Sequence, residues 1–213
     1  MEWSVPLQKL ELTKIRLGNL MSRVHREKKP LVPLAYADGQ MIMPVLTILL
    51  PHLVVESYDT PTGKLILTLD TPWITNKLTS VQTSLLNAIY QQQTSWFGAK
   101  LFSYDEIVTL FQPMIDKNKL HLYCPTTLED KRKGNGVIKV WKGGDWIEGV
   151  RPGFFVEGER VRVAFQIQGI SLQLSGNDDR WTGRARLQHR ILSVYLPSPK
   201  PSISSEVPTQ KQQ

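Results

Sequence analysis

The chain has 213 residues, 41% of them hydrophobic, and its 26 lysines and arginines against 19 aspartates and glutamates give a formal net charge of +7. This length allows one domain with a full core or two small ones, and no apolar run is long enough to span a membrane. The basic balance favours a polyanionic partner, most often nucleic acid, while the single cysteine excludes an internal disulfide and favours an intracellular location.

The N-terminal part, residues 1–70, is predicted to be mostly β. Residues 10–17 read as a first strand, and residues 41–58 are apolar and rich in strand formers. Pro44 within that second stretch argues for an edge strand or a bulge. After a turn, residues 64–69 alternate apolar and polar side chains and predict a further strand.

Two short stretches are dense in lysine and arginine, one at residues 21–30 and one at residues 129–136. A basic run of this kind is a solvated loop in many proteins. For residues 21–30 a second interpretation is open: in a binding protein this run would be an arm that follows phosphates, or a nuclear import signal.

Helices are predicted over residues 77–112, because the period of the apolar residues changes there. Leu78, Val81, Leu85 and Ile89 follow helical spacing. A second helix begins at Ser103, which forms a capping box with the glutamate three residues later.

The C-terminal strands, residues 119–196, are organised around a long hairpin. Its first arm places Val161, Val163, Phe165 and Ile167 on one face, and at Gly169 the alternation slips by one residue, which predicts a β-bulge. Its return arm places basic and apolar side chains on opposite faces. The basic face has two interpretations: a solvated sheet face of mixed charge, or a surface that holds phosphates and bases.

Together these elements predict an α+β, β-rich fold: a Greek-key, OB-like barrel with two helices and an N-terminal β extension. One domain is expected over residues 1–196, followed by a disordered tail at residues 197–213, which is rich in proline, serine and glutamine.

No motif for catalysis, cofactor binding or metal binding is recognisable in the sequence. His121 and Cys124 are the only neighbouring His/Cys pair, and a three-residue offset on a strand puts them on opposite faces. No glycine-rich phosphate loop opens a helix. We therefore expect neither cofactor nor metal, and a binding protein in place of an enzyme.

Aromatic residues interleaved with basic ones are the pattern that a single-strand binder needs. Taken singly, each tryptophan is better explained by burial in the core, since tryptophan is a common core residue. The residues predicted to bind nucleic acid are Trp96, Lys100, Lys139, Trp141, Lys142, Arg162, Arg180, Trp181, Arg184, Arg186 and Arg190.

From residue 96 to residue 195 the order of short motifs resembles the OB-fold single-stranded-DNA-binding proteins of large eukaryotic DNA viruses. The resembling pieces are Trp96-Phe-Gly-Ala-Lys100, Ser103-Tyr-Asp-Glu-Ile107, Phe111-Gln-Pro113, Leu120-His-Leu-Tyr-Cys-Pro125, Val137-Ile-Lys-Val140, Phe155-Val-Glu-Gly-Glu-Arg-Val-Arg-Val163 and Gln168-Gly-Ile170. That family tends to place an aromatic residue shortly after the Gly-Ile pair, where this chain has Ser171-Leu172. The N-terminal ninety or so residues are unmatched.

The resemblance implies a protein that coats single-stranded DNA, or RNA, during replication or recombination, with little sequence preference. It also implies a location in the nucleus or a viral replication compartment, and it allows a homo-oligomer. The alternative is a viral structural or scaffolding protein that assembles through its sheet edges. No membrane partner is expected in either case.

Overall fold

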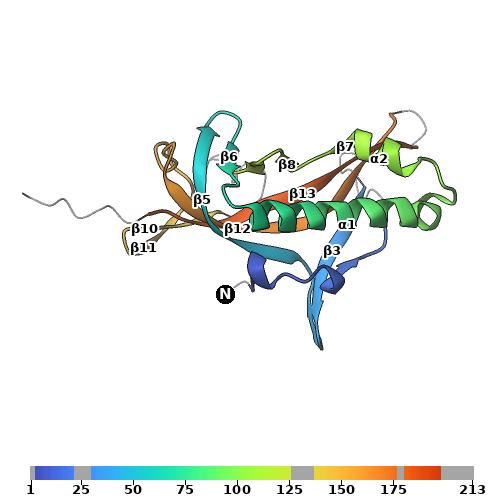
Figure 1. The fold of residues 1–213 in the computed structure, drawn as a ribbon, viewed down its shortest axis with the longest axis horizontal. Helices are drawn as coiled ribbons and strands as arrows, with labels where there is room; N and C mark the ends of the chain where they lie inside the picture. Colours follow the sequence, from blue (N-terminus) through green and yellow to red (C-terminus); the bar gives the residue numbers. More distant parts are fainter. Residues whose placement is uncertain (1–2, 22–29, 126–136, 177–179, 198–213) are drawn as a thin grey trace, which may run out of the picture.

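The computed structural model describes residues 3–21, 30–125, 137–176 and 180–197 (Figure 1). The basic run at residues 22–29, the loop at 129–136 and the predicted tail beyond residue 197 lie outside these ranges. The elements in chain order are β1 (Val5–Pro6), η1 (Leu7–Lys9), η2 (Leu12–Lys14), β2 (Ile15–Leu17), β3 (Leu31–Asp38), β4 (Met41–Met43), β5 (Leu46–Asp59), β6 (Lys64–Thr68), α1 (Pro72–Phe97), α2 (Tyr104–Leu110), β7 (Phe111–Gln112), β8 (Ile115–Asp116), β9 (Lys119–Tyr123), β10 (Lys139–Lys142), β11 (Asp145–Glu148), β12 (Arg160–Leu174) and β13 (Trp181–Tyr195).

The described part of the chain is an α+β, strand-rich fold built on one large mixed sheet, as the sequence predicts in outline. The main strand order is β11-β10-β13-β12-β5-β6-β9-β8, with β1 on β5, β7 on β13, and β2, β3 and β4 branching from the far end of β12. The sheet is not closed, so the predicted OB-like Greek-key barrel is not confirmed.

The outer edge of β13 explains why the sheet stays open. A closed barrel needs β13 to pair with β9 along its length, but that edge of β13 is occupied by two other strands. β10 pairs with β13 in parallel at one end, and β7 pairs with it in parallel at the other. Between them, a hydrogen bond from the Tyr123 N–H to His189 Nε2 (3.0 Å) links β9 to β13.

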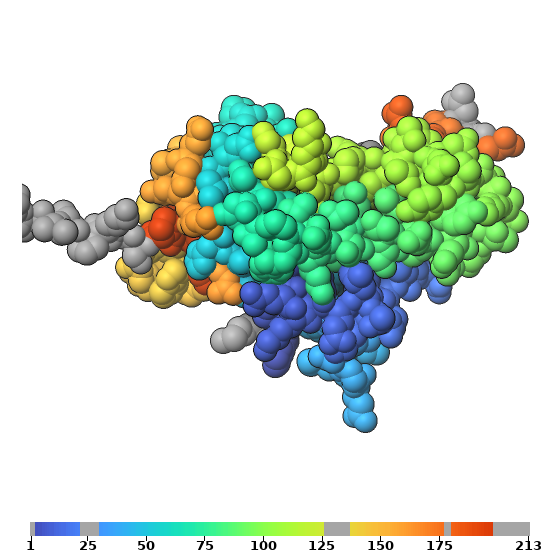
Figure 2. All heavy atoms as spheres, viewed as in Figure 1, coloured from blue at the N-terminus to red at the C-terminus, as the bar shows by residue number. Residues whose placement is uncertain are grey.

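Helix α1 crosses one face of the sheet and supplies much of the core (Figure 1). Its buried residues Ile74, Leu78, Val81, Leu85 and Ile89 recur every three to four positions, so they form one stripe that packs on the buried side chains of the strands. The helix begins at Pro72, five residues earlier than predicted, and it ends at Gly98, whose φ of 75° is left-handed. The N-terminal segment lies against the same helix (blue against green in Figure 2).

The second helix, α2, begins with the predicted capping box. The Ser103 side chain accepts from the Glu106 N–H at 3.3 Å, and the Glu106 carboxylate accepts from the Ser103 N–H at 2.8 Å. A fully buried amide, Gln93, fixes the segment between the helices, because its oxygen accepts from the N–H groups of Leu101 and Phe102 at 3.0 and 2.8 Å.

The long hairpin β12–β13 is the centre of the sheet, and its predicted face pattern is confirmed. Val163, Phe165 and Ile167 are fully buried on the α1 side. The register shifts between Ile167 and Gly169, so the predicted bulge is present. Beyond it Ile170 and Leu172 again face the core, and β12 changes its neighbour from β5 to β3.

The N-terminal region is less regular than predicted. Residues 10–17 form a 3-10 turn and only a short strand, with Lys14 in the turn bonded to Glu11 (2.6 Å) and Asp38 (3.0 Å). The hairpin β3–β4 projects from the body (light blue in Figures 1 and 2). Neither helix in the described ranges is both long and apolar enough to cross a bilayer.

Candidate nucleic-acid interface

The sheet face opposite α1 is polar, aromatic and basic, and we call it the outer face. Paired residues on neighbouring strands point to the same face, so the register places these side chains in rows that cross five strands. These rows include His52, Lys139, Trp141, Trp146, Glu148, Arg162, Gln166, Arg186, Gln188, Arg190, Ser193 and Tyr195.

One row brings three aromatic side chains together at the β10–β11 end of the outer face. Trp146 pairs with Trp141, and Trp141 pairs with Tyr195. The ring centroids of Trp146 lie 5.3 Å from those of both Trp141 and Tyr195, at interplanar angles of 65° and 69°. Because Trp146 is 50% exposed, the cluster offers an accessible indole face to a planar ligand.

The next residue in the same row is a cation, Arg162. Tyr195 pairs with Arg162, which in turn pairs with His52 on β5. Arg162 is partly buried, and its Nε donates to the Leu50 carbonyl oxygen at 3.1 Å, which orients the guanidinium on the face. Aromatic rings and a fixed guanidinium therefore lie side by side across four adjacent strands.

Further cations extend the basic surface along β13. Lys139 pairs with Ser193, and Arg190 pairs with Gln166. The buried Nε of Arg190 has no hydrogen-bond partner among the described residues. Among the outer-face residues defined above, Glu148, opposite Lys139, is the one carboxylate against four lysine and arginine side chains. These rows of the outer face, which cross β11, β10, β13, β12 and β5, are therefore basic.

Trp181, predicted to stack on bases, lies instead in the core with only 3% exposure. Its ring is stacked on Phe97 (5.2 Å between centroids, 12° between planes) and meets Phe102 edge-on at 5.0 Å. Its Nε1 donates to the Arg184 carbonyl oxygen at 3.0 Å. With both its surfaces and its polar atom engaged, the indole is unavailable to a base, so this prediction is wrong.

Other predicted residues lie away from the outer face. Trp96 is partly buried and contacts Phe97, and the Lys100 ammonium lies 3.8 Å from the Tyr90 ring centroid and bonds to its hydroxyl. Lys142 points to the opposite side of β10 from Trp141, with its ammonium 4.7 Å from the Phe154 ring centroid. Arg180 is exposed immediately before β13.

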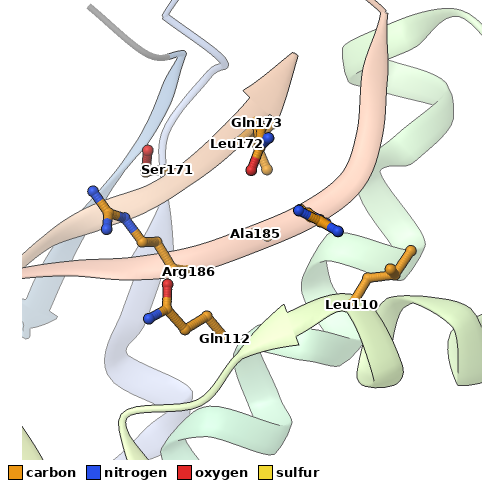
Figure 3. A pocket seen from close by; sticks show the side chains of 8 residues that line it. Leu110, Gln112, Ser171, Leu172, Gln173, Ala185 and Arg186 are labelled. Carbon is orange, nitrogen blue, oxygen red and sulfur yellow. The ribbon is translucent and has the colours of Figure 1, made fainter. Parts of the chain in front are cut away.

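At the far end of the outer face, a cavity of about 290 Å³ opens between β7, the end of β12 and the start of β13. Figure 3 shows Arg186, Gln112 and Ser171 on one side of this opening, with Gln173 on another. The full lining is Leu110, Gln112, Ser171, Leu172, Gln173, Arg184, Ala185 and Arg186, and we call it the β7 pocket. The predicted residues Arg184 and Arg186 therefore belong to one concave site.

The structure thus brings together six of the predicted residues on the outer face and its β7 pocket: Lys139, Trp141, Arg162, Arg184, Arg186 and Arg190. It adds Tyr195 and Gln112, which the sequence did not indicate, and Trp146, an aromatic candidate that was left out of the predicted site. Trp141 and Trp146 flank a turn that contains two glycines. This local signal could have predicted the short hairpin that pairs the two indoles. The parallel pairing that delivers Tyr195 and Gln112 leaves no local sequence signal.

The chemistry available on this surface is recognition of flat rings and of anions. Among the described residues, no group of three or more His, Cys, Asp or Glu side chains is arranged to hold a metal ion. Comparison with known proteins gives no family model, no curated protein and no solved structure that matches the chain.

Proposed function

We propose that the protein binds single-stranded nucleic acid, in the first place DNA rather than RNA, on its outer face and with little sequence preference. The single observation that carries the proposal is the row Trp146, Trp141, Tyr195 and Arg162 across β11, β10, β13 and β12. Rings that accept unpaired bases and guanidinium groups that hold phosphates are the two parts that a sequence-tolerant single-strand site needs.

The charge of the outer face supports the same function. Four cations oppose one carboxylate in the rows of the outer face defined above, and this excess of positive charge favours a polyanion. Unpaired strands are favoured over duplexes because only their bases are free to stack on the exposed indole.

The cellular role that we propose is the coating of strands during DNA replication or recombination, in the nucleus or a viral replication compartment, without a catalytic step. This assignment rests on the resemblance of residues 96–195 to viral single-strand binders. A closed OB-like barrel is not required, since an open sheet face presents the same side chains.

Titration with oligo-dT at two salt concentrations, followed by tryptophan fluorescence, tests the proposal. We expect quenching, weaker binding of the duplex, and a slope of log K against log salt of about −3, because each of four phosphate contacts contributes roughly −0.7. Trp146→Ala should cost about 1–3 kcal/mol of binding free energy, a loss of roughly 5- to 150-fold. Arg162→Gln should make the salt slope shallower by about 0.7.

Matched controls lie on the α1 side of the sheet. Trp73, 38% exposed in the first turn of α1, and Lys77, in its second turn, are the corresponding aromatic and cation there. Trp73→Ala and Lys77→Gln should leave affinity and salt slope unchanged. Equal affinity of the wild-type protein and Trp146→Ala, or equal binding of single strands and duplexes, would overturn the proposal.

A scaffolding function is the second candidate, and the β3–β4 hairpin is the observation that favours it. Ile42 and Met41 are 69% and 45% exposed on β4, whose other edge is unpaired within the described sheet. An uncharged apolar edge strand is a site for pairing with another chain. A scaffold should self-associate without oligonucleotide, and Ile42→Lys should shift it to monomer in sedimentation experiments while leaving oligo-dT binding intact.

A further inference from the structure

The β7 pocket lies at one end of the outer face and belongs to the same surface. Its central row is Gln112 on β7, Arg186 on β13 and Ser171 on β12, which the strand register pairs directly. At the opposite end of β13, Tyr195 belongs to the aromatic row. A nucleic-acid strand that runs along β13 from the aromatic row would therefore reach the pocket (Figures 1 and 3).

The lining of the pocket is suited to an anion. It holds two arginines and two glutamines and contains no aspartate, glutamate or histidine. Arg184 and Arg186 are both exposed, and neither guanidinium forms an ion pair or hydrogen bond with another described residue. Planar guanidinium forks are the donors best suited to phosphate oxygens, and amide and hydroxyl donors complete such sites.

The size and the positive charge of the pocket suit a phosphorylated end of a nucleic-acid strand. A volume of about 290 Å³ is enough for a phosphate with part of its nucleotide. A terminal phosphate carries about −1.5 to −2 charges near pH 7, against −1 for an internal one. Two neighbouring arginines that have no carboxylate partner among the described residues match that larger charge.

We propose that the β7 pocket binds a terminal phosphate, a phosphomonoester, of the strand held on the outer face. This inference rests on the proposed function, since the strand brings the phosphate to the pocket. Arg184 and Arg186 hold the phosphate oxygens, and Gln112 and Ser171 donate to those left free. The protein thereby distinguishes a phosphorylated chain end from a hydroxyl end.

The test compares four dT12 oligonucleotides by fluorescence anisotropy: hydroxyl-ended, 5′-phosphorylated, 3′-phosphorylated and phosphorylated at both ends. We expect a terminal phosphate to tighten binding by about 10- to 100-fold, the usual gain from new charge-assisted hydrogen bonds. The 5′ and 3′ arms show which end enters the pocket. Inorganic phosphate and dTMP, added as competitors, should remove the preference without abolishing binding of the hydroxyl-ended strand.

Variants assign the preference to the pocket. Arg184→Gln, with Arg186 intact, should reduce the ratio of affinities for phosphorylated and hydroxyl-ended strands to near one. Arg162→Gln, at the other end of the face, should weaken both strands and leave that ratio unchanged, and Lys77→Gln should change neither. Because Arg184 is exposed, an unchanged melting temperature is expected and confirms that the variant is folded.

The two proposals fail in different ways. Equal affinity for all four ends in a protein that binds hydroxyl-ended dT12 overturns the pocket assignment and leaves the outer-face function standing. A preference that survives Arg184→Gln also overturns the pocket assignment. No binding of any dT12 overturns the proposed function, and in that case phosphorus NMR with dTMP still decides whether the pocket takes a phosphomonoester.

Discussion

Gly169 occupies a position where no side chain fits. A Cβ built on it would lie 2.3 Å from the Val32 carbonyl oxygen, well inside the closest approach of real Cβ atoms. The contact atom is backbone, in the strand that pairs with β12 at this point. The glycine therefore permits both the bulge and the close approach of β3.

We predict that Gly169→Ala destabilises the protein by about 3 kcal/mol or more, because β3 must separate from β12 to admit the methyl group. Urea denaturation followed by circular dichroism measures the loss. Gly176→Ala is the matched control, since a Cβ there meets nothing within 4 Å. Equal effects of the two substitutions would show that β3 is not held as closely as described.

At the residue scale, the sequence predicted well which side chains share one face of a strand, and predicted poorly which of them are buried. The alternation of β12 and the slip at Gly169 follow from the spacing of apolar and polar side chains, which is local information. The same alternation does not distinguish an exposed indole from a buried one. Trp181 stands among arginines in sequence, yet Phe97 and Phe102, which cover it, come from the end of α1 and the segment after it.

At the element scale, the stack of Phe97, Trp181 and Phe102 joins the end of α1 to the start of β13. We predict that Trp181→Phe lowers stability by about 1–3 kcal/mol, through the lost ring area and the lost hydrogen bond to the Arg184 carbonyl. Affinity for oligo-dT should change less than twofold, because the indole is buried. Thermal unfolding and fluorescence titration measure the two effects, and a large loss of affinity at unchanged stability would restore Trp181 to the interface.

Local signals predicted the elements, and long-range pairing decided their assembly. The capping box of α2 and the apolar stripe of α1 each depend on residues that are close together in the sequence. Nothing near β10 or β7 in the sequence indicates that both pair in parallel with β13. Those two contacts explain why the open sheet was mistaken for a barrel and why Tyr195 and Gln112 escaped the sequence-based site.

At the scale of the whole molecule, stability should depend on pH through His189. Burial, together with the charge of Arg186, lowers the pKa of His189 in the folded state, and neutral Nε2 accepts the Tyr123 N–H at 3.0 Å. The unfolded chain takes up a proton below about pH 6.5 that the folded chain resists. Stability is therefore full above about pH 6.5 and falls as the pH decreases, until the folded-state pKa is reached.

We predict that this residue contributes up to about 1.4 kcal/mol per pH unit to the decline in unfolding free energy below pH 6.5. Urea midpoints measured from pH 7.5 to 5.0 give the slope. His189→Gln retains an acceptor but does not titrate, so its profile should be flatter by that amount. Parallel profiles for the two proteins would contradict the assignment of a neutral imidazole between β13 and β9.

Helix α1 lies across one side of the sheet, opposite the outer face, so a protein bound to DNA through its outer face would turn this helix away from the DNA. Successive copies lying on one DNA through the same surface would all display this helix to their surroundings. A dye or affinity tag attached at Gln92, exposed on α1, should consequently stay reachable in the filament, whereas one placed beside Trp146 should be hidden. Electron micrographs of labelled filaments would therefore show decoration on the perimeter.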